Sequence, residues 1–207
     1  MRLLPAIIAM ATIVVASNIL VQFLLLDGLL TWGAFTYPFA FLVTDIANRL
    51  YGARAARQII VAGLVVGIIC SLIGTQIMLE YGPAVGLRVA IGSATAFLLA
   101  QLLDVAVFDR LRSGSWWRAP LVSTLVSSSI DTALFFTIAF SAQITLFPAS
   151  ANAAVEWAQA PAPLLMFGPE MPLWISLALA DWAVKLTIAM LALFPFRLLT
   201  SRHSQTS

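Results

Sequence analysis

Residues 120–146 read PLVSTLVSSSIDTALFFTIAFSAQITL, a run dominated by apolar and small residues that contains one charged side chain, Asp131. A helix that crosses a bilayer needs about 20 mostly apolar residues, because the hydrocarbon layer is about 30 Å thick and each residue adds about 1.5 Å. Asp131 stands near the middle of the run, where an ionisable group is costly unless it faces other protein groups or water. The stretch therefore predicts a membrane-spanning helix with a polar inner face.

Five further runs have the length and composition of membrane spans. Each is expected to be helical, because lipid offers no hydrogen-bond partners to the backbone. Pro38 predicts a broken or interfacial beginning of the second span. The first run exceeds the apolar part of a signal peptide and is retained as a span. The predicted fold is all-α, one polytopic membrane domain of residues 1–207 whose tail, 198–207, is disordered. Its six spans are approximately 3–26, 34–50, 59–79, 85–108, 120–146 and 172–196.

The composition excludes several classes of protein. Hydrophobic residues make up 61% of the 207 residues and charged residues 10%, against roughly 25% charged in soluble domains. Cys70 and His203 are each the only residue of their type, so the chain offers no internal disulfide and no ligand set for zinc, haem or an iron–sulfur cluster. The net charge of +2 does not indicate nucleic-acid binding. The sequence predicts no metal, no cofactor and no nucleic-acid partner.

The arginines predict the orientation of the chain. If the chain crosses the membrane six times, nine arginines fall on one side and only Arg88 on the other. Basic residues collect on the cytoplasmic side of membrane proteins. Both termini are therefore expected to be cytoplasmic. The nine are Arg2, Arg49, Arg54, Arg57, Arg110, Arg112, Arg118, Arg197 and Arg202.

Five ionisable side chains fall within the predicted spans. Each would cost roughly 2.5–3.5 kcal/mol at the bilayer centre, so they are expected to face the bundle interior or a wet cavity. Polar residues three or four positions away share a helix face with several of them. Such stripes on most of the helices indicate a shared polar interior that can bind a small solute. The five are Asp45, Asp104, Asp131, Asp181 and Lys185, and the polar neighbours include Asn48, Gln101 and Thr124, with Asn18 and Gln22 paired on the first span.

Structural explanations also exist for these polar groups. Asp181 and Lys185, four positions apart, can neutralise each other. Asp104 can reach Arg110 or Arg112 at the interface, and the serines and threonines of the fifth span can favour close helix packing. Asp131 is harder to explain in this way. It has no basic partner on its own helix, so its partner must come from another helix or from a ligand.

Catalysis and channel activity have weaker support than transport. The only histidine lies outside the predicted spans, so a serine nucleophile would lack that base. A Ser–Lys dyad with Lys185 lacks the G-x-S-x-G elbow, although an aspartyl dyad is geometrically open. Rings of repeated charge and filter-like motifs, which channels use, are also absent from the sequence. A carrier for a small solute is therefore the favoured interpretation.

Residues 36–52 read TYPFAFLVTDIANRLYG and are followed by a basic run. This stretch resembles the signature of the queuosine precursor transporter family, also called the putative vitamin uptake transporters. Arg49 stands where many members of that family have glutamate. Other resemblances follow in chain order, at SNIL (17–20), the block 96–112, the block 127–136 and the last span. The matching residues are Pro38, Phe41, Asp45, Asn48, Tyr51 and Gly52, then Gln101, Asp104, Asp131, Lys185 and Pro195.

The resemblance implies a bacterial inner-membrane transporter that imports a 7-deazaguanine precursor of queuosine, either the nitrile base (preQ0) or the aminomethyl base (preQ1). One carboxylate can accept the adjacent N1–H and 2-amino donors of such a base. An aromatic ring can stack on its face. Asp181 and Lys185 are expected to form a charge pair that opens and closes during transport. The expected substrate contacts are Asp131, Asp104, Gln101, Asp45, Asn48, Phe41 and Asn18.

The sequence leaves the energy source open. The ATP-binding motif G-x-x-x-x-G-K-[ST] is absent. An ion gradient, a partner ATPase or the substrate gradient must therefore drive import, and a buried aspartate makes proton coupling one of the choices. The alternative function is the substrate-binding subunit of a multi-component, ECF-like vitamin importer, and an intramembrane enzyme is third. The sequence also leaves open whether the protein forms a homo-oligomer.

Overall fold

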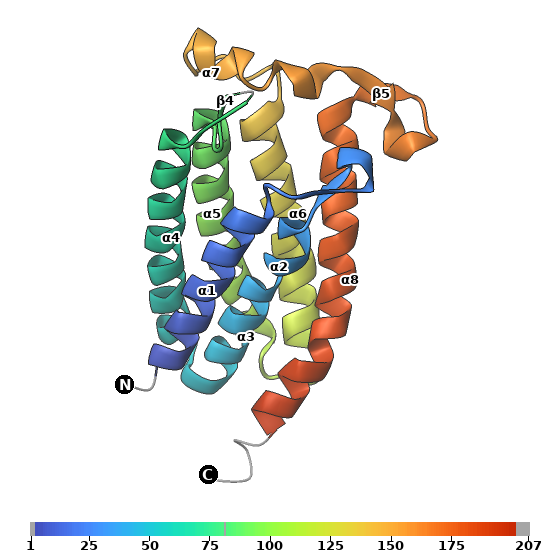
Figure 1. Ribbon diagram of the computed structural model, residues 1–207. Helices are drawn as coiled ribbons and strands as arrows, with labels where there is room; N and C mark the ends of the chain where they lie inside the picture. Colours follow the sequence, from blue (N-terminus) through green and yellow to red (C-terminus); the bar gives the residue numbers. More distant parts are fainter. Residues whose placement is uncertain (1–2, 81, 202–207) are drawn as a thin grey trace.

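A computed structural model describes residues 3–80 and 82–201. The described chain forms a bundle of helices whose connections carry short hairpins and single-turn helices (Figure 1). The bundle helices are α1 (Leu4–Leu20), α2 (Gly33–Thr36), α3 (Phe39–Tyr51), α4 (Ala53–Gln76), α5 (Leu87–Leu111), α6 (Arg118–Phe140) and α8 (Leu173–Ser201). The hairpins are β1 (Leu24–Leu25) with β2 (Leu30–Thr31), β3 (Met78–Leu79) with β4 (Gly82–Pro83), and β5 (Pro161–Pro163) with β6 (Glu170–Pro172), all antiparallel. The remaining short helices are η1 (Leu26–Gly28), α7 (Ala149–Ala153), η2 (Glu156–Gln159) and η3 (Leu164–Met166).

The outer surface of the bundle is apolar. Four helices, α4, α5, α6 and α8, are long and apolar enough to cross a membrane, and α1 is a shorter apolar helix. Large side chains point outward from them, including Leu72, Leu191 and Phe194, which are 61%, 68% and 72% exposed. Soluble proteins rarely expose so large an apolar surface, whereas lipid tails solvate it. The chain is a multi-pass membrane protein of the all-α class.

The second predicted span is interrupted, as Pro38 indicated. It forms two helices, α2 and α3, and Pro38 lies immediately before α3, where its missing N–H is tolerated. α2 packs directly on the end of α1, because a Cβ atom added to Gly33 would lie 2.9 Å from the backbone nitrogen of Val21. The interruption leaves Tyr37 between two helices, where its hydroxyl reaches Asp131.

Two helices end earlier than predicted. α1 ends at Leu20 rather than near residue 26, because the β1–β2 hairpin follows and turns through Asp27 and Gly28, both with positive φ. α6 ends at Phe140 rather than near residue 146, since Ser141 is already extended. Apolar composition continues past both ends, so hydropathy alone cannot locate them.

Two other helices extend into polar sequence. α4 begins at Ala53 rather than near residue 59, and its first turns carry exposed arginines that can reach the interface. α8 continues to Ser201. Residues 198–201, which were expected in a disordered tail, are therefore helical. The rest of that predicted tail, 202–207, lies outside the described residues.

A long connection between α6 and α8, residues 141–172, is called the outer loop here. It crosses the end of the bundle opposite to the first turn of α1 and the last turn of α8 (Figure 1). Arg88 on α5 is 2% exposed and anchors this loop. Its guanidinium donates to the carbonyl oxygens of Ile138 (2.9 Å) and Ser141 (2.7 Å) and to Asn152 Oδ1 (3.0 Å).

α5 and α6 approach each other closely. A Cβ atom added to Gly92 on α5 would lie 3.3 Å from the carbonyl oxygen of Phe135 on α6. Small residues at such contacts allow two helix backbones to pack tightly. This packing buries Ser123, Ser127 and Ser128 of α6 completely. The serine stripe is therefore held against neighbouring helices, where its hydroxyls meet buried carboxyl groups.

Candidate functional site

A buried lysine lies between two aspartates inside the bundle. Lys185 Nζ on α8 lies 2.7 Å from Asp131 Oδ2 on α6 and 2.5 Å from Asp181 Oδ2, one turn away on α8. The lysine is 3% exposed and Asp131 is 2% exposed. The predicted contact between Asp181 and Lys185 is confirmed. The partner of Asp131 is Lys185 on another helix, which is one of the two alternatives that the sequence left open.

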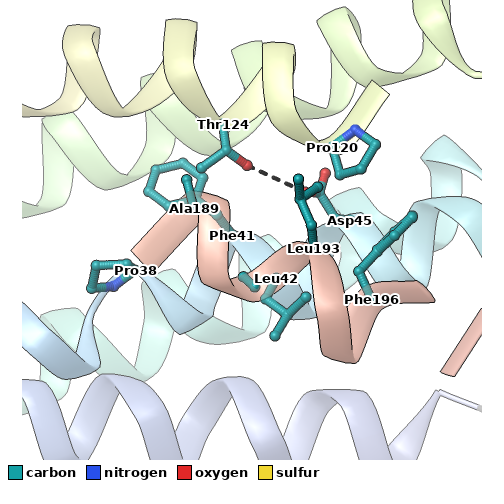
Figure 2. A pocket seen from close by; sticks show the side chains of 10 residues that line it. Pro38, Phe41, Leu42, Asp45, Pro120, Thr124, Ala189, Leu193 and Phe196 are labelled. Carbon is teal, nitrogen blue, oxygen red and sulfur yellow. Dashed lines mark hydrogen bonds between the residues drawn. The ribbon is translucent and has the colours of Figure 1, made fainter. Parts of the chain in front are cut away.

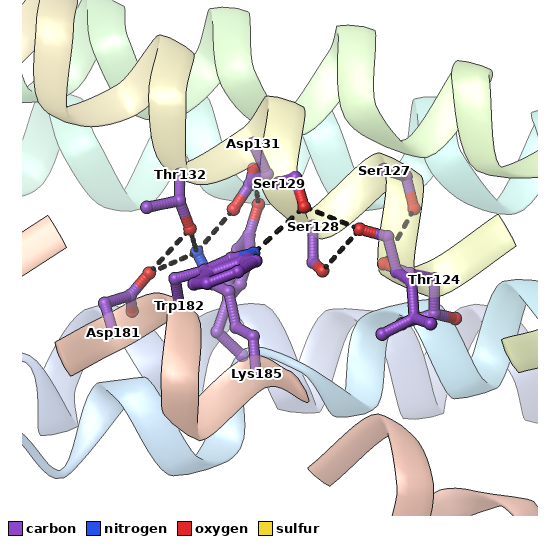
Figure 3. Close-up of polar contacts among 11 residues, drawn as sticks. Thr124, Ser127, Ser128, Ser129, Asp131, Thr132, Asp181, Trp182 and Lys185 are labelled. Atoms are coloured by element: carbon purple, nitrogen blue, oxygen red, sulfur yellow. Dashed lines mark hydrogen bonds and ion pairs between the residues drawn. The ribbon is translucent and has the colours of Figure 1, made fainter. Parts of the chain in front are cut away.

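Hydroxyl groups complete this charged network. Thr132 Oγ1 accepts a hydrogen bond from Lys185 Nζ (3.0 Å) and donates to Asp181 Oδ2 (3.0 Å). The hydroxyl of Tyr37 donates to Asp131 Oδ1 at 3.2 Å. Figure 3 shows the lysine beside Asp131, Thr132 and Asp181. All three ammonium protons have acceptors, which is the condition for keeping a buried lysine charged.

A cavity of about 380 Å³ opens beside the network. Its volume falls within the range of about 300–1,000 Å³ that is typical of small-molecule sites. The charged network, Asn18 and several serine, threonine and glutamine side chains form its polar part, and aliphatic and aromatic side chains form the rest. The cavity also touches the β1–β2 hairpin and the outer loop, so it extends toward the end of the bundle opposite to the first turn of α1. The aromatic residues of the lining are Tyr37, Phe135, Phe136, Phe140 and Trp157.

A second polar cluster lies buried among α3, α5 and α6. Asp45 on α3 accepts hydrogen bonds from Ser123 Oγ (3.4 Å) and Thr124 Oγ1 (3.2 Å). Asp104 on α5 accepts one from Ser127 Oγ at 2.9 Å. The two carboxyl groups meet the same face of α6, because their donors Ser123 and Ser127 lie one helical turn apart. Figure 2 shows Asp45 with Thr124 beside a small pocket.

Two amides flank this carboxyl pair. Gln101 lies one turn before Asp104 on α5, and its Oε1 accepts a hydrogen bond from Thr44 Oγ1 at 2.8 Å. Asn48 lies one turn after Asp45 on α3, and its Nδ2 donates to the carbonyl oxygen of Val105 at 3.3 Å. Three buried atoms of this cluster have no hydrogen-bond partner among the described residues. They are Asn48 Oδ1, Gln101 Nε2 and Asp104 Oδ2.

The structure divides the predicted substrate contacts into two groups. Asn18 and Asp131 line the cavity, together with the charge pair Asp181 and Lys185. The other five lie outside the lining of that cavity. Phe41 is 1% exposed, and its ring packs edge-on against Tyr37 at 6.3 Å between centroids. The five are Phe41, Asp45, Asn48, Gln101 and Asp104.

Two alternative explanations are now decided. Asp104 forms no ion pair with Arg110 or Arg112 in the described chain, because Arg112 pairs with Asp109 and also donates to the carbonyl oxygen of Asn48. The serines and threonines of α6 do serve close packing, but several also donate to the buried carboxylates.

Sequence reasoning missed three residues of the site. Tyr37 and Thr132 bind the charged network, and Trp157 lines the cavity from the outer loop. Two of them had a usable signal, because Tyr37 and Thr132 are adjacent to Pro38 and Asp131, respectively. Trp157 lies in the connection after the fifth predicted span, where no spacing pattern ties it to the cavity. Within residues 3–80 and 82–201, no group of three His, Cys, Asp or Glu side chains is placed to hold a metal ion.

Comparison with known proteins identifies the family. Residues 31–200 match the family described as "Putative vitamin uptake transporter". The chain is 33% identical over 196 residues to a protein of Escherichia coli K12 named "Queuosine precursor transporter", covering 88% of this chain and 79% of that protein. It is 39% identical over 141 residues to a "Probable queuosine precursor transporter" of Haemophilus influenzae, covering 62% and 57%. A third relative, from Bacillus subtilis and also named "Probable queuosine precursor transporter", is 29% identical over 138 residues, 58% of each chain. No solved structure gives a significant match. The chain therefore belongs to the putative vitamin uptake transporter family, which includes the queuosine precursor transporters.

Proposed function

We propose that this protein imports a 7-deazaguanine precursor of queuosine, either the nitrile or the aminomethyl base, and that the base binds in the cavity beside Asp131. The names of the relatives support the substrate class. The single observation that carries the site is a cavity of about 380 Å³ whose lining combines a buried carboxylate with aromatic rings and aliphatic side chains. Flat, hydrogen-bonding bases bind in sites of this composition.

The base would compete with Lys185 for Asp131. A guanine-like edge presents N1–H and a 2-amino group, and one carboxylate accepts both. Lys185 can release Asp131 at reduced cost because Asp181 and Thr132 still bind its ammonium group. Tyr37, which already donates to Asp131, would hold the carboxylate in place. Binding of the base would therefore replace the ion pair between Lys185 and Asp131 with hydrogen bonds from the base to Asp131, so that neither Asp131 nor Asp181 is left without a partner.

The proposed topology has six spans, with α2 and α3 together forming the second. Both termini would be cytoplasmic and the membrane would be the bacterial inner membrane. The first turn of α1 and the last turn of α8 lie at one end of the bundle (Figure 1), which supports an even number of crossings. The arginine-bearing connections α3–α4 and α5–α6 lie at that same end, as the positive-inside rule requires. The cavity then faces the periplasm, the side from which an importer takes its substrate.

The proposed energy source is the proton gradient. Without an ATP-binding motif of its own, the chain needs an ion gradient, the substrate gradient or a partner ATPase. A proton gradient would allow the chain to work alone. Under the ECF-like alternative, the chain binds its substrate but requires an ATPase partner for uptake. An intramembrane enzyme would instead release a chemically altered solute, which mass spectrometry detects.

The test is queuosine in tRNA. A bacterium that lacks both precursor synthesis and its own importer would express the chain and receive each base at a low concentration. We expect queuosine to be restored by the wild type, lost with Asp131→Asn and retained with the control Asp109→Asn, which changes an exposed carboxylate. No restoration by wild-type protein that is present in the membrane would refute stand-alone import. Uptake that appears only with an added ATPase would establish the ECF-like alternative.

A further inference from the structure

The carboxyl pair formed by Asp45 and Asp104 is separate from the cavity. Asp45 is 3% exposed and Asp104 is fully buried. The two belong to different helices, α3 and α5, and meet at the serine stripe of α6. Hydroxyl donors reach both carboxyl groups, but a hydroxyl does not carry a compensating charge. The pair therefore differs from Asp131, whose charge is balanced by Lys185.

No lysine or arginine of the described chain lies within ion-pair distance of these two carboxyl groups. Arg49, one turn from Asp45 on α3, directs its guanidinium to the carbonyl oxygen of Arg112 (2.8 Å) and over the ring of Phe108. Most other charged groups on the packed helices are either paired or exposed: Asp131 with Lys185 and Asp181, Asp109 with Arg112, and Arg54, Arg57, Arg110, Arg118 and Arg197 at the surface. The exception is Arg88, which is buried on α5 and binds the carbonyl oxygens of Ile138 and Ser141.

Two adjacent carboxylates without a cation repel each other strongly in a dry interior, and one shared proton removes that repulsion. Two of the unpartnered atoms are acceptors that need a donor. Asp104 Oδ2 and the flanking Asn48 Oδ1 are buried and receive no hydrogen bond in the described chain. Buried polar atoms are normally satisfied. A proton on the pair would turn one of its acceptor oxygens into a donor.

The surroundings of the pair offer space for one water molecule on one side and lead to Asp131 on the other. A pocket of about 10 Å³, about the size of one water molecule, lies beside Asp45 and is lined by Pro38, Phe41 and Thr124 (Figure 2). On the other side, Ser127, which donates to Asp104, lies one helical turn from Asp131. The carboxyl pair is therefore close to the substrate cavity along α6 but does not line it.

From this arrangement we propose that Asp45 and Asp104 together form the proton-binding site of the transporter. In the conformation described here the pair holds one proton, bonded to a carboxyl oxygen and shared with the second carboxylate. When the bundle opens inward, cytoplasmic water solvates both carboxylates and the proton leaves to that water, so one proton enters with each base. This inference rests on the proposed import function and names the residues that would couple it to protons.

The experiment uses the purified full chain in liposomes with labelled nitrile base, which is uncharged. The membrane potential is clamped, and the interior is made more alkaline by one pH unit. One proton per base supports accumulation of up to about tenfold, because one pH unit corresponds to a factor of ten in equilibrium. We expect the wild type and Asp109→Asn to accumulate the base. Asp45→Asn and Asp104→Asn should lose that accumulation but still exchange labelled for unlabelled base at equal pH.

Three results would overturn the proposal. Accumulation by Asp104→Asn at the wild-type level would remove the carboxyl pair from coupling. Loss of exchange as complete as in Asp131→Asn, in protein that stays folded, would assign the pair to substrate binding. Accumulation driven by a sodium gradient and not by the pH gradient would replace the proton with another ion.

A second measurement does not depend on the substrate. Infrared spectroscopy of the protein in bilayers detects the C=O stretch of a protonated carboxyl group, and the double variant Asp45→Asn/Asp104→Asn should lose this band at neutral pH. Its absence from the wild type would refute the shared proton, whether or not the base is transported. If the band is present but the wild type shows no exchange of either base, the import function fails and the proton site stands.

Discussion

Replacing Lys185 with methionine tests whether the network beside the cavity is a buried ionic structure. The ammonium group of Lys185 contacts Asp131 at 2.7 Å, Asp181 at 2.5 Å and Thr132 at 3.0 Å, and the lysine is 3% exposed. Methionine has a similar length but no charge, so two carboxylates would lose their shared cation. Removing one partner of a buried ion pair costs about 3–5 kcal/mol. We expect a loss of stability in that range.

Two further variants resolve the origin of that loss. Asp131→Asn keeps an acceptor oxygen beside Lys185, which also retains Asp181, so we expect a smaller cost of about 1.5–3 kcal/mol. The double variant Lys185→Met/Asp131→Asn leaves only one carboxylate without its cation. Its cost should fall below the sum of the two single costs by about 1–3 kcal/mol, because the residues share one network.

Thermal unfolding in detergent, followed by tryptophan fluorescence, measures these costs. For chains of this size about 1 kcal/mol corresponds to roughly 2–4 °C, so Lys185→Met should lower Tm by about 6–20 °C. Asp109→Asn is the matched control, because its pair with Arg112 is exposed and contributes little. A Tm for Lys185→Met within about 2 °C of wild type, or additive costs in the double variant, would refute the buried ionic network.

Three further predictions concern other parts of the structure. Tyr37→Phe removes the hydroxyl that donates to Asp131, and we expect the base concentration for half-maximal uptake to rise about 2- to 12-fold; an unchanged value would exclude Tyr37 from binding. Gly92→Val should lower stability by about 1–3 kcal/mol in thermal unfolding, because its Cβ would meet the α6 backbone, whereas Gly86→Ala, which has open space, should not. Arg88→Met removes the side-chain donors that hold the outer loop, so limited proteolysis should cut that loop faster than in wild type; equal rates would show that other contacts hold it.

Much of the fold follows from the sequence because apolar length is a strong signal in lipid. The long apolar helices and the interruption at Pro38 were predictable from composition and backbone chemistry. The helix ends were not. α1 ends at Leu20, before Asp27 and Gly28 turn the chain, although the sequence stays apolar, and α8 continues through residues 198–201, beyond the predicted end of the last span.

The polar residues of the site were predictable from the sequence, but their separation into a cavity and a closed cluster was not. The spacing of Asp181 and Lys185 correctly predicted their contact. Asp131 has its basic partner, Lys185, on another helix, which was one of the two predicted alternatives. Helical spacing says which residues share a face, but it does not say which neighbouring helix that face meets. The cavity at Asp131 and the closed cluster at Asp104 could therefore not be separated before the packing of the helices was known.

In the proposed mechanism, α6 is the physical link between the base and the proton. Asp131, which faces the cavity, and Ser127, which binds Asp104, lie four positions apart on a helix that is continuous from Arg118 to Phe140. A continuous helix moves as a rigid element, so a displacement of α6 that separates Asp131 from Lys185 also shifts Ser127 relative to Asp104. One motion can thus change both the contacts of the base and the hydration of the carboxyl pair. Coupling then needs no contact between the base and the proton, and it depends on the continuity of α6 between these two residues.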